Sequence, residues 1–420
     1  MRIATPGTTS AWVRVALVMF AVGWGANQFS PMLIVYRHAL GLGPGEIAGL
    51  FAIYAATLIP GLLAGGPLSD RFGRRACVLP FAALSPVATL LLVLRPRDLA
   101  LIAAGRALAG LCSGMVFGPA TAWVQDLSGG SAASARRSAL ALSAGFGLGP
   151  VVAALLAQWA GGDPLVVPYL PHLVLGVAAF AAALTAPSVR SPSHQETAAP
   201  RIVPGALRTR AFWFAVAPAA PFVFGSMALA IVVLPEEVTS AHSLSAAYAG
   251  LMILLAFAAG IGVQPAARAL AARDDRLGII AGLGFAAAGA AVSVAAVAGP
   301  SRALAALGAV LLGLAYGLCL VCGLQEVERL TGPRDRGTVL ACYYVLAYLG
   351  FGAPYGADAL NAAFGRPGAF AVLAVAAAAL TAVVAAGQRT GLVRLPASHG
   401  GTWEEHAAVR KESVSQQNLR

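Results

Sequence analysis

The chain has 420 residues, of which 59% are hydrophobic and 11% are charged, and its formal net charge is +11. Soluble domains carry about 25% charged residues, so this composition excludes a water-soluble protein and predicts an integral membrane protein. The positive charge does not indicate nucleic-acid binding, because the arginines lie between apolar segments instead of forming one patch.

Charged, Pro-rich and Gly-rich breaks divide the chain into apolar segments long enough to cross a hydrocarbon core of about 30 Å as helices. Twelve segments lie near residues 14–36, 46–66, 76–94, 99–125, 137–159, 165–186, 212–235, 246–267, 277–299, 303–325, 337–359 and 368–388. This even number places both termini on one side of the membrane.

The arginines decide which side that is. If the termini are cytoplasmic, few arginines fall in the outer loops: Arg37, Arg95, Arg97, Arg302 and Arg366. Most of the others then lie in cytoplasmic segments, as the positive-inside rule requires. We therefore expect a multi-pass protein of the cytoplasmic membrane with both termini in the cytoplasm.

The loop between the second and third segments reads Gly66-Pro-Leu-Ser-Asp70-Arg71-Phe-Gly73-Arg74-Arg75. It resembles the signature loop between helices two and three of the major facilitator superfamily, and every core position of that pattern is filled. The resemblance implies an all-α fold of twelve transmembrane helices in two pseudo-symmetric six-helix bundles. It also implies a gating role for Asp70, Arg71, Arg74 and Arg75, with Asp70 facing the positive N-terminus of the eleventh helix near Gly337.

Arg106 lies about seven residues into the fourth segment, or roughly 10 Å deep at 1.5 Å per residue. A charge at that depth is unfavourable unless it is paired or hydrated, which makes Arg106 a functional candidate. The alternative is that it snorkels to the outer headgroups. Arg106 and Gly110 resemble the family's fourth-helix motif, whose arginine is implicated in proton coupling. Because arginine keeps its proton, it would tune a nearby carboxylate or bind an anionic solute directly.

The fifth segment carries Gly145, Gly149 and Pro150, which resemble the family's antiporter motif and so imply export. The match is partial, because Ala153 and Ala154 replace the family's glycine pair and Arg136 replaces its earlier glycine. The alternative is simple packing through small residues.

Composition also predicts the domain organisation: an N-terminal bundle over 1–186, a cytoplasmic linker over 187–211, a C-terminal bundle over 212–390 and a cytoplasmic tail over 391–420. The two halves repeat faintly, since Gly110 and Gly114 match Gly313 and Gly317 at one constant offset. A parallel repeat of this kind is typical of secondary transporters with a site between the halves.

In that fold helices one, four, seven and ten line the central cavity. The resemblance therefore implies substrate contacts at Asn27, Gln28, Phe222, Met227, Tyr316 and Gln325. Aromatic residues, Met and few charges favour an amphipathic solute. No Asp or Glu lies at the midplane of a segment, so proton coupling is implied by the resemblance alone.

These observations predict a secondary active transporter that exports a drug or metabolite in exchange for protons by alternating access. The first alternative is an importer or facilitator of a small nutrient. A membrane-embedded enzyme or sensor is the remote one, because no buried nucleophile, metal cluster or acid pair is visible. We expect a monomer in the lipid bilayer whose partners are its solute and protons, with no cofactor, no metal and no nucleic acid.

Overall fold

The computed structural model describes residues 11–128, 132–188, 205–210, 212–238, 245–273, 277–331 and 336–389. It confirms the predicted all-α membrane architecture, with 11 helices long and apolar enough to cross a membrane among these residues. The last of these, Cys342–Gly387, has 46 residues and bends at Gly365, whose φ is +73°. Only glycine adopts this conformation readily, so the bend divides the segment into two passes and the total reaches twelve. The predicted tail over 391–420 and most of the linker over 187–211 lie outside the described residues.

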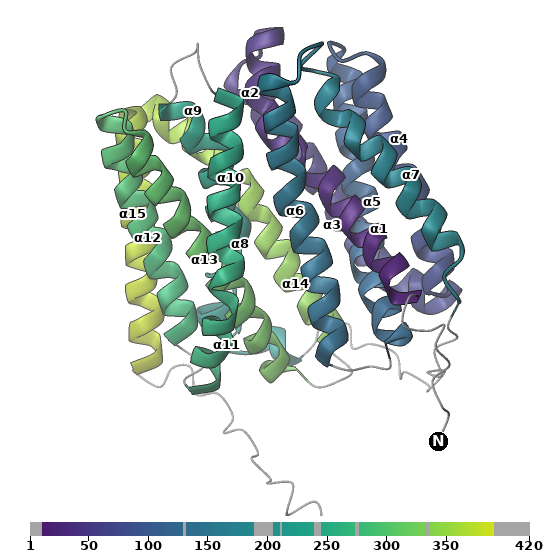
Figure 1. Cartoon of the computed structure of the whole chain (residues 1–420). Helices are drawn as coiled ribbons and strands as arrows, with labels where there is room; N and C mark the ends of the chain where they lie inside the picture. The colour runs from purple at the N-terminus through teal and green to yellow at the C-terminus, as the bar shows by residue number, and fades with distance from the viewer. Residues whose placement is uncertain are drawn as a thin grey trace, which may run out of the picture.

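The N-terminal half contains six passes. They are formed by α1 (Ala11–Asn27) with α2 (Phe29–Leu40), α3 (Pro44–Phe72), α4 (Arg74–Leu94), α5 (Leu99–Leu127), α6 (Ala132–Trp159) and α7 (Leu170–Leu184). The C-terminal half contains α8 (Ala220–Ala228), α9 (Leu234–Val238), α10 (Ser245–Gly262), α11 (Gln264–Arg273), α12 (Leu277–Ala298), α13 (Arg302–Leu330), α14 (Arg336–Leu349) and α15 (Ala353–Arg389). Figure 1 shows the two halves side by side, one purple to blue and the other green to yellow.

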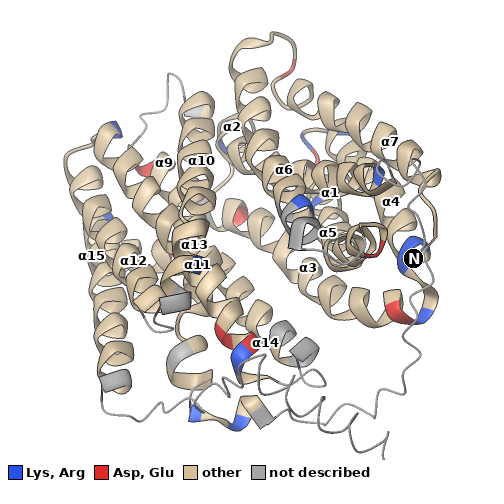
Figure 2. Ribbon diagram, turned by 60° about the horizontal axis from the view of Figure 1, so that its bottom comes forward, with Lys and Arg blue, Asp and Glu red and all other residues tan. Residues whose placement is uncertain are grey.

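The bundle has two ends, each named here after one residue. The Asp70 end holds the loop between α3 and α4, and the Arg37 end is the opposite end, where α2 and α9 lie near the top of Figure 1. Most charged residues lie at helix ends in Figure 2, and the helix interiors are largely uncharged. Charge at the ends and apolar surface between them is what a bilayer requires.

The first pass is one span over Ala11–Leu40, as the sequence predicts, and its helical hydrogen bonding is interrupted near Gln28. Pro31 has no backbone N–H, so it cannot donate a helical hydrogen bond to the carbonyl of Asn27. Gln28 itself keeps helical dihedral angles, with φ −55° and ψ −24°, so the chain passes from α1 into α2 without leaving the helical conformation. This interruption lies beside the central cavity described below.

Glycines bring helices into backbone contact in the same way in both halves. A side chain at Gly110 or Gly114 of α5 would collide with the backbone of α3, and one at Gly313 or Gly317 of α13 would collide with the backbone of α10. These four glycines are the ones that match between the halves in the sequence. The repeat therefore preserves a helix pair, α3 with α5 and α10 with α13.

Two glycines of α6 give a matched stability test. An added Cβ at Gly145 would strike the backbone of Phe20 and Trp24 in α1, whereas one at Gly147 would meet nothing within 4 Å. We expect Gly145→Ala to lower the melting temperature of the purified protein, because α1 must move away. Gly147→Ala is expected to leave it unchanged or raise it, since alanine favours a helix by about 0.5–1 kcal/mol over glycine. Equal melting temperatures for the two variants would contradict the close contact.

The halves pack together toward the Arg37 end. One apolar core there combines Phe29 and Tyr36 of α2 with Ile231, which follows α8, and with Leu234 of α9. An ion pair crosses the same junction, with Arg37 Nη1 2.5 Å from Glu236 Oε2. The Arg37 end is therefore closed by contacts between the halves.

Candidate functional site

A small cavity lies between the halves near the middle of the bundle. Its walls include Asn27, Ser30, Arg106 and Met227, together with a set of aromatic residues that we call the aromatic cage. The cage consists of Phe51, Tyr54, Phe146, Phe224, Phe257, Tyr316, Tyr348 and Phe351. The volume of the cavity is about 50 Å³, so the surrounding side chains nearly fill it in this state.

Rings of the cage meet across the boundary between the halves. Phe146 of α6 stacks on Phe257 of α10 with centroids 6.2 Å apart and planes 5° from parallel. Phe51 of α3 meets Phe351 edge-on at 5.0 Å. Each pair contains one ring from each half, so these contacts link the two halves across the cavity.

The junction between α1 and α2 supplies the polar wall. Asn27 Nδ2 donates to the carbonyl of Phe146 at 2.8 Å, and Ser30 Oγ donates to Asn27 Oδ1 at 2.7 Å. Both side chains are buried, and the two hydrogen bonds fix their orientation. The polar groups of the cavity are therefore positioned before any solute enters.

Arg106 of α5 reaches the same cavity and is only 3% exposed. Its Nε donates to the carbonyl of Leu50 at 3.3 Å and its Nη1 to the carbonyl of Ala26 at 3.1 Å. The guanidinium carbon lies 4.4 Å from the ring centroid of Phe29 and 4.7 Å from that of Tyr54. A side chain held by these contacts faces the protein interior, so snorkelling to the membrane surface does not describe this arrangement.

The charge of Arg106 has no acidic counterpart in the part of the chain that the structure describes. None of the ion pairs recorded among those residues includes Arg106. Carbonyl dipoles and the faces of two rings stabilise the cation in place of a carboxylate. Among the described residues Arg106 therefore has no carboxylate to tune, and of the two roles expected from the sequence the binding of an anionic solute stays open.

The structure brings half of the predicted substrate contacts to the cavity. Asn27, Met227 and Tyr316 line it, whereas Gln28, Phe222 and Gln325 do not. Gln28 Nε2 donates to Thr89 Oγ1 at 3.1 Å inside the N-terminal half. Neighbours in a helix point about 100° apart, so residues adjacent in sequence face different surroundings.

Phe222 and Gln325 also lie away from the cavity, one because of its face and the other because of its position along the helix. Phe222 packs beside Phe285 against a separate apolar cluster of the C-terminal half. Gln325 lies in the last turns of α13, toward the Asp70 end. The sequence correctly assigns both residues to helices seven and ten but cannot tell which turn or face reaches the cavity.

Most of the aromatic cage is missed by sequence reasoning. Phe51, Tyr54, Phe146, Phe257 and Phe351 come from passes two, five, eight and eleven, where the resemblance implies no substrate contacts. The only available signal was the clustering of aromatic residues near the middle of these passes, and in a membrane helix such residues equally suit the lipid face.

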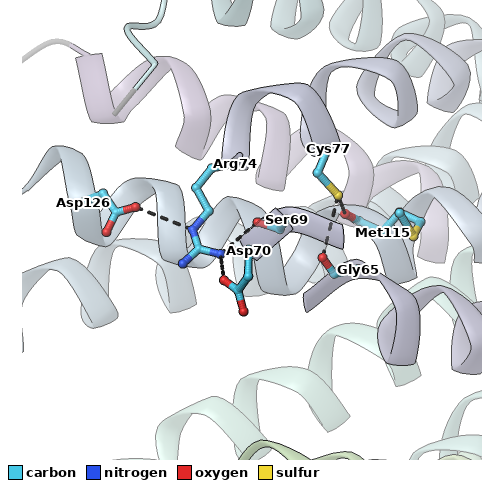
Figure 3. Close-up of polar contacts among 7 residues, drawn as sticks. All are labelled: Gly65, Ser69, Asp70, Arg74, Cys77, Met115 and Asp126. Carbon is cyan, nitrogen blue, oxygen red and sulfur yellow. Dashed lines mark hydrogen bonds and ion pairs between the residues drawn. The ribbon is translucent and has the colours of Figure 1, made fainter. Parts of the chain in front are cut away.

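The loop after α3 is organised by Arg74 (Figure 3). Its Nη1 donates to Ser69 Oγ at 2.9 Å and also to the carboxylate of Asp70. Its Nε lies 3.6 Å from Asp126 Oδ2 at the end of α5. In the same view Cys77 Sγ lies 3.7 Å from the carbonyl of Gly65. Arg74 thereby ties α3, α4 and α5 together at the Asp70 end.

Asp70, the acidic residue of this loop, is exposed to solvent. The side chain of Asp70 is 70% exposed, and its ion pair among the described residues is with Arg74 of the same loop. The predicted partner near Gly337 lies at the start of α14, where the side chains of 332–338 are outside the described part. The proposed contact of Asp70 with α14 thus remains a prediction about another state.

The two other arginines of the loop differ in role. Arg75 donates to the carbonyls of Leu184 at 2.7 Å and Ala186 at 3.2 Å, which caps the end of α7. Arg71 lies over the ring of its neighbour Phe72 at 5.2 Å. Arg75 therefore fixes helix α7, and Arg71 does not link separate helices through this contact.

The glycines of α6 and the following proline lie between two partners. Gly145 and Gly149 pack against the backbone of α1, while the carbonyl of Pro150 lies on the side that approaches Gly250 of α10. Helix α6 therefore contacts α1 of its own half and α10 of the C-terminal half. Close packing accounts for the two glycines, and the implied link to export stays a prediction.

A second cavity of about 310 Å³ lies at the Arg37 end. Its lining carries charges of both signs, including Arg37, Arg366, Glu236, Glu237 and Asp358. Arg366 Nε lies 3.1 Å from Glu237 Oε2, so these charges are largely paired with one another. Among the described residues no group of three or more His, Cys, Asp or Glu side chains that could hold a metal ion is found.

Comparison with known families identifies the fold. The model of the Major Facilitator Superfamily matches residues 15–353 of the chain. The chain belongs to the Major Facilitator Superfamily. It is therefore a multi-pass transporter of small molecules and not an enzyme, in agreement with the coarser part of the sequence prediction.

Solved structures of transporters share the fold. The nucleoside transporter NupG is 11% identical over 90% of this chain and 99% of its own, with a TM-score of 0.69. A peptide transporter POT in complex with sulfate is 15% identical over 92% and 96%, and a POT family transporter in complex with 5-aminolevulinic acid is 12% identical over 90% and 96%, each with a TM-score of 0.73. No curated protein sequence matches the chain at a significant level. At these identities the likeness shows the fold alone, and none of these three proteins is described as a drug exporter.

Proposed function

We propose that this member of the Major Facilitator Superfamily carries a small amphipathic solute through the central cavity by alternating access in the cytoplasmic membrane. One observation carries the proposal: a cavity between the halves combines an aromatic cage with preorganised Asn27, Ser30 and Arg106. Concave sites with apolar walls and a few convergent polar groups are typical binding sites. The chain is proposed to act as a monomer.

The Asp70 end is assigned to the cytoplasm. This orientation places most arginines of the loops inside, in accordance with the positive-inside rule. Because the halves are closed at the Arg37 end, the structure then corresponds to a state whose outer side is shut. Alternating access requires a second state in which the Arg37 end opens and the Asp70 end closes.

Proton-coupled export is the proposed direction, supported by the resemblance of Gly145, Gly149 and Pro150 to the antiporter motif. Uptake is the second candidate, and it is supported by the similarity in fold to a nucleoside and a peptide transporter. Acidic residues near the two ends, such as Glu236 and Asp70, are the available proton carriers, because the cavity lining contains no carboxylate among the described residues.

Transport by the purified protein tests the direction. The protein is reconstituted into proteoliposomes with an imposed pH gradient and exposed to a panel of labelled aromatic and nutrient solutes. Export is supported if an acidic lumen drives accumulation of a solute through molecules oriented with the Asp70 end outward. Accumulation driven instead by external acid supports uptake, and no transport of any solute would contradict the proposed function.

Substitutions in the cavity test its location. We expect Met227→Trp to fill the cavity and abolish transport, and Asn27→Ala to change solute preference, because both side chains line the site. Leu254→Ala is the control, since Leu254 is 42% exposed on the outside of α10. Initial rates in proteoliposomes measure the effect. Normal transport by Met227→Trp would show that the solute does not pass through this cavity.

A further inference from the structure

Arg106 is the one charged residue that lines the central cavity, and several of its N–H donors make no hydrogen bond to a described residue. Arginine carries five N–H donors. In Arg106 the recorded bonds use Nε and one donor of Nη1, while Nη2 donates no hydrogen bond to any described residue. The side chain lines the cavity, so these remaining donors are available to a molecule bound there.

The electrostatics of the site favour an anion. A buried charge without a counter-ion is unfavourable, and cation–π contacts with Phe29 and Tyr54 together with two carbonyl bonds offset only part of that penalty. A negatively charged group beside the guanidinium would complete the set with charge-assisted hydrogen bonds. A cationic solute would meet like charge instead.

The shape of the site places an apolar body next to that charge. The ring of Tyr54 contacts the guanidinium of Arg106 and also lies 6.5 Å from the ring of Phe351. Phe351 in turn stacks on Phe224 at 5.0 Å. The rings leave only about 50 Å³ between them, so a flat ring attached to an anionic group can lie among these side chains, with its charged end at Arg106, once the halves move apart.

The fold itself does not require a charge at this position. Ala309 is the counterpart of Arg106 in the repeat, and it is fully buried in the apolar core that the two halves share toward the Arg37 end. The same helix pairing thus forms without an arginine. The charge is better explained by the content of the cavity than by helix packing.

We propose that the transported solute is an aromatic organic anion, with a carboxylate-like group bound by Arg106 and its ring held by the aromatic cage. This inference rests on the proposed function, because it takes the central cavity as the substrate site. It narrows that function to one class of solute. Arginine suits this role because its planar donors match the two oxygens of a carboxylate.

Three probes with one ring system test the inference: naphthalene-2-carboxylate, naphthalene-2-carboxamide and naphthalen-2-ylmethylammonium. Binding to the full-length protein in lipid nanodiscs is measured by calorimetry, with empty nanodiscs as the blank. We expect the carboxylate to bind about tenfold to a hundredfold more tightly than the amide, because it gains charge-assisted bonds. The ammonium probe is expected to bind more weakly than the amide.

Arg106→Gln is expected to make carboxylate and amide bind equally while amide affinity is kept, and Arg106→Lys to retain part of the preference. A merely structural arginine would lower the affinity for all probes together. The inference is overturned if wild-type protein does not prefer the carboxylate, if it binds none of the probes, or if the preference survives in Arg106→Gln. Should Arg106→Gln not fold, an undiminished preference in Arg106→Lys overturns it equally.

Met227→Trp separates this inference from the proposed function. If that variant loses binding of every probe but the wild type shows no preference for the anion, the cavity stands and the anionic class fails. If the probes still bind to Met227→Trp with unchanged affinity, the cavity is not their site and the location given in the proposed function fails as well.

Discussion

Asp70→Asn is expected to leave the protein folded and to slow transport by an order of magnitude or more. In the structure Asp70 is largely exposed and pairs with Arg74, and an exposed pair contributes about 0–1 kcal/mol to folding. In the outward-facing state we propose that the carboxylate lies against the positive N-terminus of α14. Losing up to about 2 kcal/mol there would shift the balance of states roughly thirtyfold.

Asp126→Asn is the matched control for this prediction. Asp126 also faces Arg74, at 3.6 Å, but it comes from α5 of the same half. Initial transport rates and melting temperatures of both variants give the answer. Equal slowing by the two substitutions would mean that Asp70 only orders the loop, and a normal rate for Asp70→Asn would refute its role in gating.

Glu236→Gln is expected to open the Arg37 end. The substitution removes the charge that Arg37 pairs with across the halves, where the two side chains are 36% and 16% exposed. For a half-buried pair the loss is about 1–2 kcal/mol, which corresponds to roughly a tenfold shift toward the state that is open at this end. Electron spin resonance distances between labels at Leu99→Cys and Leu304→Cys measure the opening. Cys342→Ser is included because the other four cysteines are buried.

Two other ion pairs at the same end provide controls. Arg97 pairs with Asp163 within the N-terminal half at 3.0 Å, and Arg366 pairs with Glu237 within the C-terminal half. Arg97→Ala and Arg366→Ala are therefore expected to leave the distance unchanged. The exchange of charges in Arg37→Glu with Glu236→Arg is expected to restore closure, since only the partners are reversed. An unchanged distance in Glu236→Gln would show that apolar packing alone closes this end.

Arg106 and Asp70 could be recognised in the sequence because charge in or beside a membrane helix is unfavourable and needs a reason. The structure adds what each contacts. Arg106 meets carbonyls and rings where the sequence allowed a carboxylate partner, and Asp70 meets Arg74 in this state. Such partners come from helices far apart in the chain, so spacing along one segment cannot identify them.

Gln28 and Phe351 illustrate the opposite difficulty. In a soluble protein the apolar face of a helix points inward, and its periodicity reveals the buried side. In a membrane the lipid face and the cavity face are both apolar, so this signal is lost. Gln28 points into the N-terminal half, whereas its neighbour Asn27 lines the cavity. Phe351 lines the cavity from the eleventh pass, where no substrate contact was expected.

The sequence by itself determined the apolar passes, the family resemblance and the glycines repeated between the halves, because length, hydropathy and small residues can be read within single helices. Tertiary structure alone decided which rings form the aromatic cage, that the Arg37 end is closed, and that the charge of Arg106 faces the cavity without a carboxylate among the described residues. These features depend on how the two halves are rotated against each other. That rotation is set by side chains from both halves at once, which no single segment of sequence encodes.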